Sequence, residues 1–199
     1  MRGRAAVLVL MALVLTGCAT TAGQGTTSSP SIETSAPGST PTPTAVADPT
    51  DPGTWVVTDA GMGPLVLGMP FAEATAAVPG LEDSCGHAWS RHDSTLWVAT
   101  WTSAPVLDEA TWYGGDLVAP GAPEQSTPKT AGGLGIGSTV ADVLAAYPDA
   151  VHDFKNHDYL VAGHIVFGFP GNLAGDIVPG ARIDSIGVAT YGPEYEYCG

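Results

Sequence analysis

A short pattern occurs twice in this chain of 199 residues and constrains its fold more than any other feature. Leu65–Pro79 aligns with Leu134–Pro148, so the second copy starts 134 − 65 = 69 residues after the first. Leu, Gly, three Ala and Pro coincide, and Glu73 aligns with Asp142. Such self-similarity predicts one structural unit that is built twice. Chance similarity between two alanine-rich segments is the alternative.

Each copy has the pattern of a short amphipathic helix. Its apolar residues follow the i, i+3, i+4, i+7 spacing of one helix face: Phe71, Ala74 and Val78 in the first copy, and Val140, Val143, Leu144 and Tyr147 in the second. Pro70 fits a first helical position, and Ser138 or Thr139 can cap the second helix. Pro79 and Pro148 end the two helices.

Strand-like alternation follows each helix. The predicted strands are Ser84–Ser90, Ser94–Thr102 and Val106–Tyr113 in the first half, and Val151–Lys155, Tyr159–Phe169 and Arg182–Tyr191 in the second. Residues 114–133, rich in Pro and Gly, join halves of about 60–113 and 130–199. A helix followed by strands, twice, predicts an α+β domain whose helices pack on one face of an antiparallel sheet.

A known fold shows the same order of elements. A Gly-Met-Pro or Gly-Ser-Thr turn, a short helix ending at Pro and a meander of strands, all duplicated, resembles the tandem-repeat β-lactamase inhibitor protein fold. The chain is also similar to the small lipoprotein of the outer-membrane assembly machinery, which has a related single unit. The resemblance covers roughly 60–199 and implies a binding protein rather than an enzyme. It assigns no functional residue, because no recognition motif matches position by position.

The N-terminus has the layout of a secretory signal, with Arg2 and Arg4 before an apolar run from Ala5 to Leu15. Leu15-Thr-Gly-Cys18 then resembles the lipobox of bacterial lipoproteins. The resemblance implies diacylglycerol transfer to Cys18, removal of residues 1–17 and a lipid anchor on the extracytoplasmic face of the cell membrane. A transmembrane helix is the alternative, but it needs roughly 20 apolar residues. A second alternative is an ordinary secretory signal that Cys18 follows by coincidence.

Residues 18–53 predict a tether. From Ala19 to Gly53 the chain is mostly Thr, Ser, Pro, Gly and Ala, with almost no bulky side chain. Such a segment cannot bury enough apolar surface to offset its chain entropy, so we expect it to be disordered. The folded domain is therefore expected at residues 54–199, behind a flexible link to the lipid.

Charge excludes one class of partner. The chain has 6 Lys and Arg against 20 Asp and Glu, for a formal net charge of −14. Nucleic-acid binding depends on neutralising phosphates with basic side chains, so we expect none. The acidity fits either a solubility role or attraction of a basic partner. Nothing in the sequence implies a cofactor.

The two remaining cysteines form a candidate disulfide. With Cys18 lipidated, Cys85 and Cys198 are an even pair in an exported protein. Their bridge ties down the C-terminus, which otherwise frays. A metal site or a reactive thiol is the alternative, but these cysteines have no CxxC-like neighbour.

Two tryptophans are the candidate binding residues. In the strand around Leu96–Trp101, Leu96 and Val98 point to one face while Trp97 and Trp101 point to the other. If the first pair meets the helices, Trp97 and Trp101 lie on the outer face and are candidate hot spots for a protein partner or a sugar. The alternative is that the tryptophans face the core.

The expected function is that of a membrane-anchored binding module for another extracytoplasmic protein. No catalytic set stands out, and no metal site is expected. The pairs His92-Asp93, His152-Asp153 and His157-Asp158 leave a small cell-envelope hydrolase or a metal-dependent enzyme as an alternative. Their polar contexts favour exposed histidines. A small-ligand sensor is a further alternative.

Overall fold

The structure is a computed structural model, and it describes residues 47–93, 95–114, 126–155, 157–170, 177–192 and 197–198. All of them belong to one compact unit, Thr44–Gly199. The signal sequence, Cys18 and nearly all of the predicted tether lie outside the described residues. Within those ranges, no helix has the length and apolar character needed to cross a membrane.

The two predicted helices are present, as α1 (Phe71–Ala77) and α2 (Val140–Ala146). Thr139 caps α2: its hydroxyl accepts from the backbone N–H of Asp142, whose carboxylate accepts from the N–H of Thr139. Hydrogen bonds from Thr139 lower the pKa of Asp142. Pro70 was predicted at the first helical position of α1. In the structure it is the N-cap, one residue before that position.

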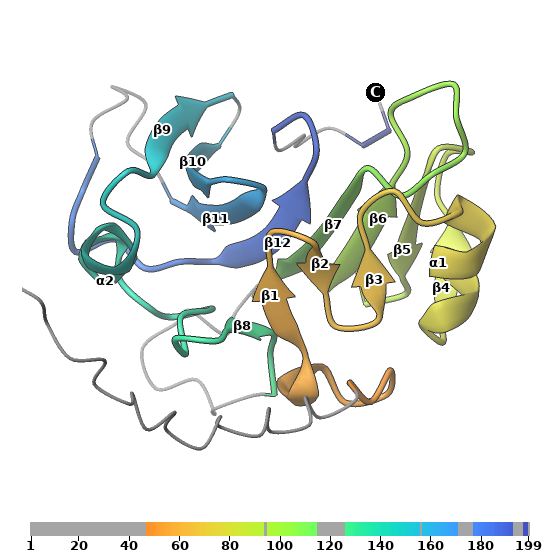
Figure 1. Cartoon of the computed structure of the whole chain (residues 1–199), viewed down its shortest axis with the longest axis horizontal. Coiled ribbons are helices and arrows are strands. Elements are labelled where there is room, and N and C mark those ends of the chain that lie inside the picture. Colours follow the sequence, from red (N-terminus) through yellow and green to blue (C-terminus); the bar gives the residue numbers. More distant parts are fainter. Residues whose placement is uncertain are drawn as a thin grey trace, which may run out of the picture. The chain divides into compact units, whose positions relative to one another are not determined.

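An eight-stranded antiparallel sheet forms the body of the domain (Figure 1). Its strand order is β4-β5-β6-β7-β12-β11-β10-β9. The strands are β4 (Leu81–Asp83), β5 (Ala88–Arg91), β6 (Leu96–Ala99), β7 (Glu109–Tyr113), β9 (Val151–Phe154), β10 (Asp158–Ala162), β11 (Ile165–Phe169) and β12 (Ser185–Ala189). A large antiparallel sheet with two helices confirms the predicted α+β class.

The number of strands differs from the prediction of three after each helix. Four strands follow α1 and four follow α2 in this sheet. The segment predicted as one strand, Tyr159–Phe169, is the hairpin of β10 and β11, because the chain turns at Gly163 and His164. β4 was missed because it is only three residues long and two of them are acidic.

The chain enters the two helices in the same way. Gly68 and Gly137 both have positive φ, at 80° and 85°. The N–H of Gly68 donates to the carbonyl of Leu107, and the N–H of Gly137 donates to that of Ile183, each at 2.8 Å. Glycine suits both positions because other residues rarely adopt this conformation.

A second, smaller sheet was not predicted. It has the order β3-β2-β1-β8, from β1 (Val56–Thr58), β2 (Gly61–Met62), β3 (Leu65–Val66) and β8 (Lys129–Thr130). A 3-10 turn at Pro52–Thr54 precedes it. β1 and β2 pack against β12. Strands of two or three residues are too short to show alternation in a sequence.

One face of the large sheet carries the main core. Phe71 and Ala74 of α1 and Val140 and Val143 of α2 are buried there. The same core contains Trp55, which precedes β1, and residues of both sheets, among them Val57, Met62, Leu96, Val98, Leu160, Phe167, Ile186 and Val188. The rings of Trp55 and Trp112 meet edge to face at 5.9 Å. We call the opposite face of the large sheet the far face.

Candidate functional site

β6 orients the candidate tryptophan side chains. Leu96 and Val98 are fully buried in the main core, as the alternation predicts. Trp97 belongs instead to a separate cluster, together with Trp101 just beyond the strand. Because neighbouring residues of a strand point to opposite faces, Trp97 lies on the far face. Both indoles are partly exposed.

A C-terminal tyrosine covers these tryptophans. The phenol ring of Tyr197 stacks on the indole of Trp97, with centroids 4.8 Å apart and planes at 11°. It also stacks on Trp101, at 5.8 Å and 17°. Tyr197 is only 5% exposed. Tyr197 of the same chain therefore occupies the far face at this position.

A buried carboxylate lies below the stacked rings. Glu109 of β7 is 1% exposed and accepts hydrogen bonds from the indole N–H of Trp101, the hydroxyl of Thr111 and the hydroxyl of Tyr197, at 3.0, 3.0 and 2.8 Å. Burial, and then the charge of Glu109, raise the pKa of the Tyr197 hydroxyl well above 10. Tyr197 is therefore a neutral donor at physiological pH.

The predicted disulfide is confirmed and fixes the position of Tyr197. Cys85 is bonded to Cys198, the residue after Tyr197. Cys85 is half-buried and Cys198 is exposed. His87 lies beside the bridge, with its Nε2 at 3.9 Å from the Cys85 sulfur, and its ring is 5.3 Å from that of Trp101. The bridge and the aromatic cluster thus form one structural unit.

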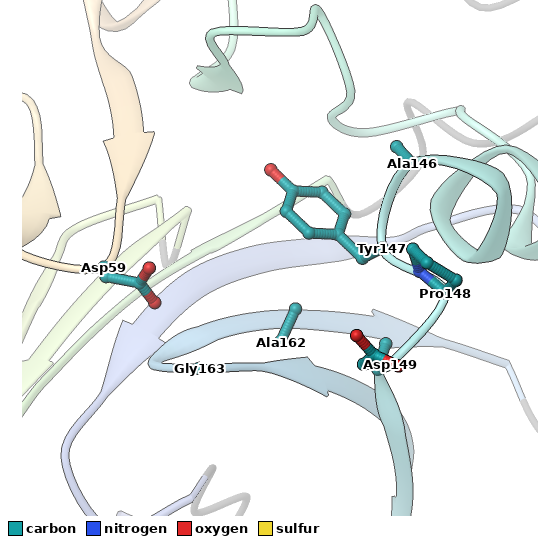
Figure 2. A pocket seen from close by; sticks show the side chains of 8 residues that line it. Asp59, Ala146, Tyr147, Pro148, Asp149, Ala162 and Gly163 are labelled. Carbon is teal, nitrogen blue, oxygen red and sulfur yellow. The ribbon is translucent and has the colours of Figure 1, made fainter. Parts of the chain in front are cut away.

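A pocket with a volume of about 350 Å³ lies at the other end of the domain. It is lined by the turn after β1, the end of α2 and the β10–β11 turn: Asp59, Ala146, Tyr147, Pro148, Asp149, Ala150, Ala162 and Gly163. Figure 2 shows the Tyr147 ring extending from the end of α2 toward the side where Asp59 lies. The N–H of His164 holds the Asp59 carboxylate at 2.9 Å. Two exposed carboxylates and a phenol hydroxyl make this pocket suitable for a cationic group.

Two histidines of the three His–Asp sequence pairs contact a carboxylate, but not that of the aspartate next to them in the sequence. His152 contacts Asp158 at 2.6 Å, and His157 contacts Asp184 at 3.0 Å. Asp158 is fully buried, and its Oδ2 has no hydrogen-bond partner among the described residues. No group of three or more His, Cys, Asp or Glu side chains in the described part of the chain is arranged to hold a metal ion.

Sequence reasoning missed the residues that complete these sites. Glu109 lies inside a predicted strand and was not singled out. Tyr197 was not named as a site residue, although the predicted bridge ties down the C-terminus beside it. The bridge to Cys198 was the usable signal, since it places the preceding residue next to Cys85. Asp59 and Tyr147 are far apart in the sequence, and only the fold brings them to one pocket.

Comparison with known proteins identifies no relative. No family model matches the chain, and neither a curated protein nor a solved structure is significantly similar to it.

Proposed function

We propose that this chain is a lipid-anchored lipoprotein whose domain acts on the extracytoplasmic face of the cell membrane as a binding module for another protein. The sequence from Arg2 to Cys18 supports the anchor, and the Ser/Thr/Pro-rich segment that follows supports a flexible tether. Two or more acyl chains on Cys18 hold a protein stably at a membrane, which a single chain does not.

We attribute the fold to duplication of one unit, a helix followed by four antiparallel strands. The equivalent hydrogen bonds of Gly68 and Gly137 support this origin. So does the strand order, in which β7 and β12, the last strands of the two units, pair at the centre of the sheet. A duplicated unit is consistent with the resemblance to the tandem-repeat β-lactamase inhibitor protein fold, which implies a binding function.

One observation carries the proposed function: Trp97 and Trp101 lie partly exposed on the far face, away from the main core. Tryptophan is one of the residues enriched among the hot spots of protein–protein interfaces. The net charge of −14 favours a partner with a basic surface. The pocket at Asp59, Tyr147 and Asp149 can accept a lysine or arginine side chain of that partner.

Cross-linking of the intact lipoprotein in cells tests this proposal. We expect one extracytoplasmic protein to be captured by the wild type, lost with Trp97→Ala and retained with Tyr191→Ala, an exposed aromatic residue outside the cluster. Circular dichroism establishes that both variants are folded. Capture of no specific protein, or equal capture by folded Trp97→Ala, contradicts the proposed surface.

An enzyme of the cell envelope is the second candidate, and the His152–Asp158 pair favours it. A histidine oriented by a buried carboxylate is a common arrangement in acid–base catalysis. Tightly bound zinc in the purified protein, or hydrolytic turnover that is lost in His152→Ala, would favour an enzyme over a binding module.

A further inference from the structure

The aromatic cluster holds Tyr197 in the way that a binding site holds a ligand. Two indole rings stack on the phenol, a buried carboxylate accepts its hydroxyl, and the side chain is almost fully enclosed. We propose that Trp97, Trp101 and Glu109 form a tyrosine-binding slot, that Tyr197 fills it within the chain, and that opening of the Cys85–Cys198 disulfide frees the slot for a tyrosine of the partner protein. This inference names the ligand chemistry and the regulation of the proposed binding surface, and it rests on that function.

The chemistry of the slot selects a phenol. Indole faces favour a planar aromatic ring at centroid distances of about 4.5–7 Å, and both stacks here fall within that range. Trp101 and Thr111 still donate to Glu109 when Tyr197 leaves, so the carboxylate stays in position to accept an incoming hydroxyl. Phenylalanine lacks that hydroxyl. Phosphotyrosine brings negative charge next to Glu109, so the slot rejects it.

The disulfide is placed to be opened. Cys198 is exposed, so a thiolate can attack its sulfur. Cys85 then leaves as a thiolate beside His87, whose imidazole donates to it and stabilises it. The reductant is a protein dithiol outside the membrane: its first thiol forms a mixed disulfide with Cys198, and its second thiol resolves that bond. Two electrons and two protons pass to Cys85 and Cys198, which become thiols, and the dithiol becomes a disulfide.

Release of Cys198 weakens the hold on Tyr197 without touching the slot itself. In the oxidised chain the bridge keeps the ring at a high local concentration, so a tyrosine from another chain cannot compete. In the reduced chain, Tyr197 keeps non-covalent contacts alone, among them the two stacks, the hydrogen bond to Glu109 and the 3.4 Å contact with the Tyr113 hydroxyl. The same contacts are then available to a tyrosine from the partner.

A binding experiment on the full chain tests the slot. The probe is a fluorescent peptide, acetyl-Tyr-Glu-Tyr-Ser-Gly, measured by anisotropy against the oxidised wild type, the reduced wild type and oxidised Tyr197→Ala. We expect binding to the last two and none to the first. The peptide with phenylalanine in place of both tyrosines binds about tenfold more weakly, and the phosphorylated peptide does not bind. Acrylamide quenching of tryptophan fluorescence rises in the same two samples.

A second measurement tests the role of His87. We expect dithiothreitol to reduce the disulfide several-fold more slowly in His87→Ala, while His92→Ala, in an exposed turn away from the bridge, is reduced at the wild-type rate. Equal rates of disulfide reduction in His87→Ala and His92→Ala would show that His87 does not assist the opening of the bridge.

The outcomes separate this inference from the proposed function. If the reduced chain unfolds, peptide binding to oxidised Tyr197→Ala tests the slot by itself, because the disulfide of that variant is intact. Folded Tyr197→Ala that binds no tyrosine peptide overturns the slot even when cells yield a cross-linked partner. Peptide binding without any cross-linked partner supports the slot and contradicts the proposed function.

Discussion

The ring of Tyr197 lies 4.8 Å from that of Trp97 and at 11° to it, although 100 residues separate them in the sequence (197 − 97 = 100). The contact joins the C-terminus to β6 on the far face of the large sheet. A chain end that makes no other anchoring contact frays. This stack, the Glu109 hydrogen bond and the disulfide together make Tyr197 and Cys198 part of the folded domain.

Tyr197→Phe removes the hydroxyl that donates to Glu109 at 2.8 Å and lies 3.4 Å from the Tyr113 hydroxyl. The stack on Trp97 and Trp101 survives, while Glu109 loses the donor that Tyr197 supplies. We expect the free energy of unfolding to fall by about 1–2 kcal/mol, since hydrogen bonds to a carboxylate exceed those between neutral groups. Urea denaturation measures it. Tyr191→Phe, at a residue 68% exposed, is the control and should match the wild type.

Alkaline pH should destabilise the domain through Tyr197. Its folded-state pKa is raised by burial and by Glu109, whereas the unfolded chain releases this proton near pH 10. Above that pH the folded state binds more protons than the unfolded state, so stability falls as pH rises. Denaturation between pH 8 and 11 checks this. An equally steep decline in Tyr197→Phe would contradict it.

Removal of the disulfide should cost the most stability of these changes. The bridge joins residues 113 apart, and the loop-entropy model assigns a closed loop of this length roughly 4–5 kcal/mol. The double variant Cys85→Ser, Cys198→Ser avoids a free thiol. We expect its denaturation midpoint to fall accordingly, with the slope almost unchanged. A midpoint equal to that of the oxidised wild type would show that the bridge adds nothing.

Gly187, at the centre of β12, has no room for a side chain. A methyl group there would clash with the carbonyl oxygen of Ala110 and lie 2.8 Å from the Cα of Thr111, both in the neighbouring strand. We expect Gly187→Ala to lower the melting temperature strongly, because such overpacking costs about 1–3 kcal/mol or more. Gly180→Ala, where nothing lies within 4 Å, should melt like the wild type.

The helices and the class of the fold could be predicted from the sequence because their signals are local. The spacing of Phe71 and Ala74, the prolines that end each helix and the Thr139 cap lie within a few residues of one another. The strand alternation gave the orientation of Leu96 and Val98 for the same reason.

The remaining features depend on contacts distant in sequence. The hairpin of β10 and β11 looked like one strand because both halves are apolar. The small sheet has strands too short for any periodicity. The position of Tyr197 follows from a covalent bond to Cys85 and from stacking on β6, neither of which leaves a pattern in neighbouring residues.

The most direct test of this account is the intact mass of the protein purified from the membrane fraction without reductant. We predict a chain that begins at Cys18, carries acyl groups on that residue and has Cys85 and Cys198 oxidised. A full-length chain from Met1, recovered in the cytosol with all three cysteines as thiols, would contradict it.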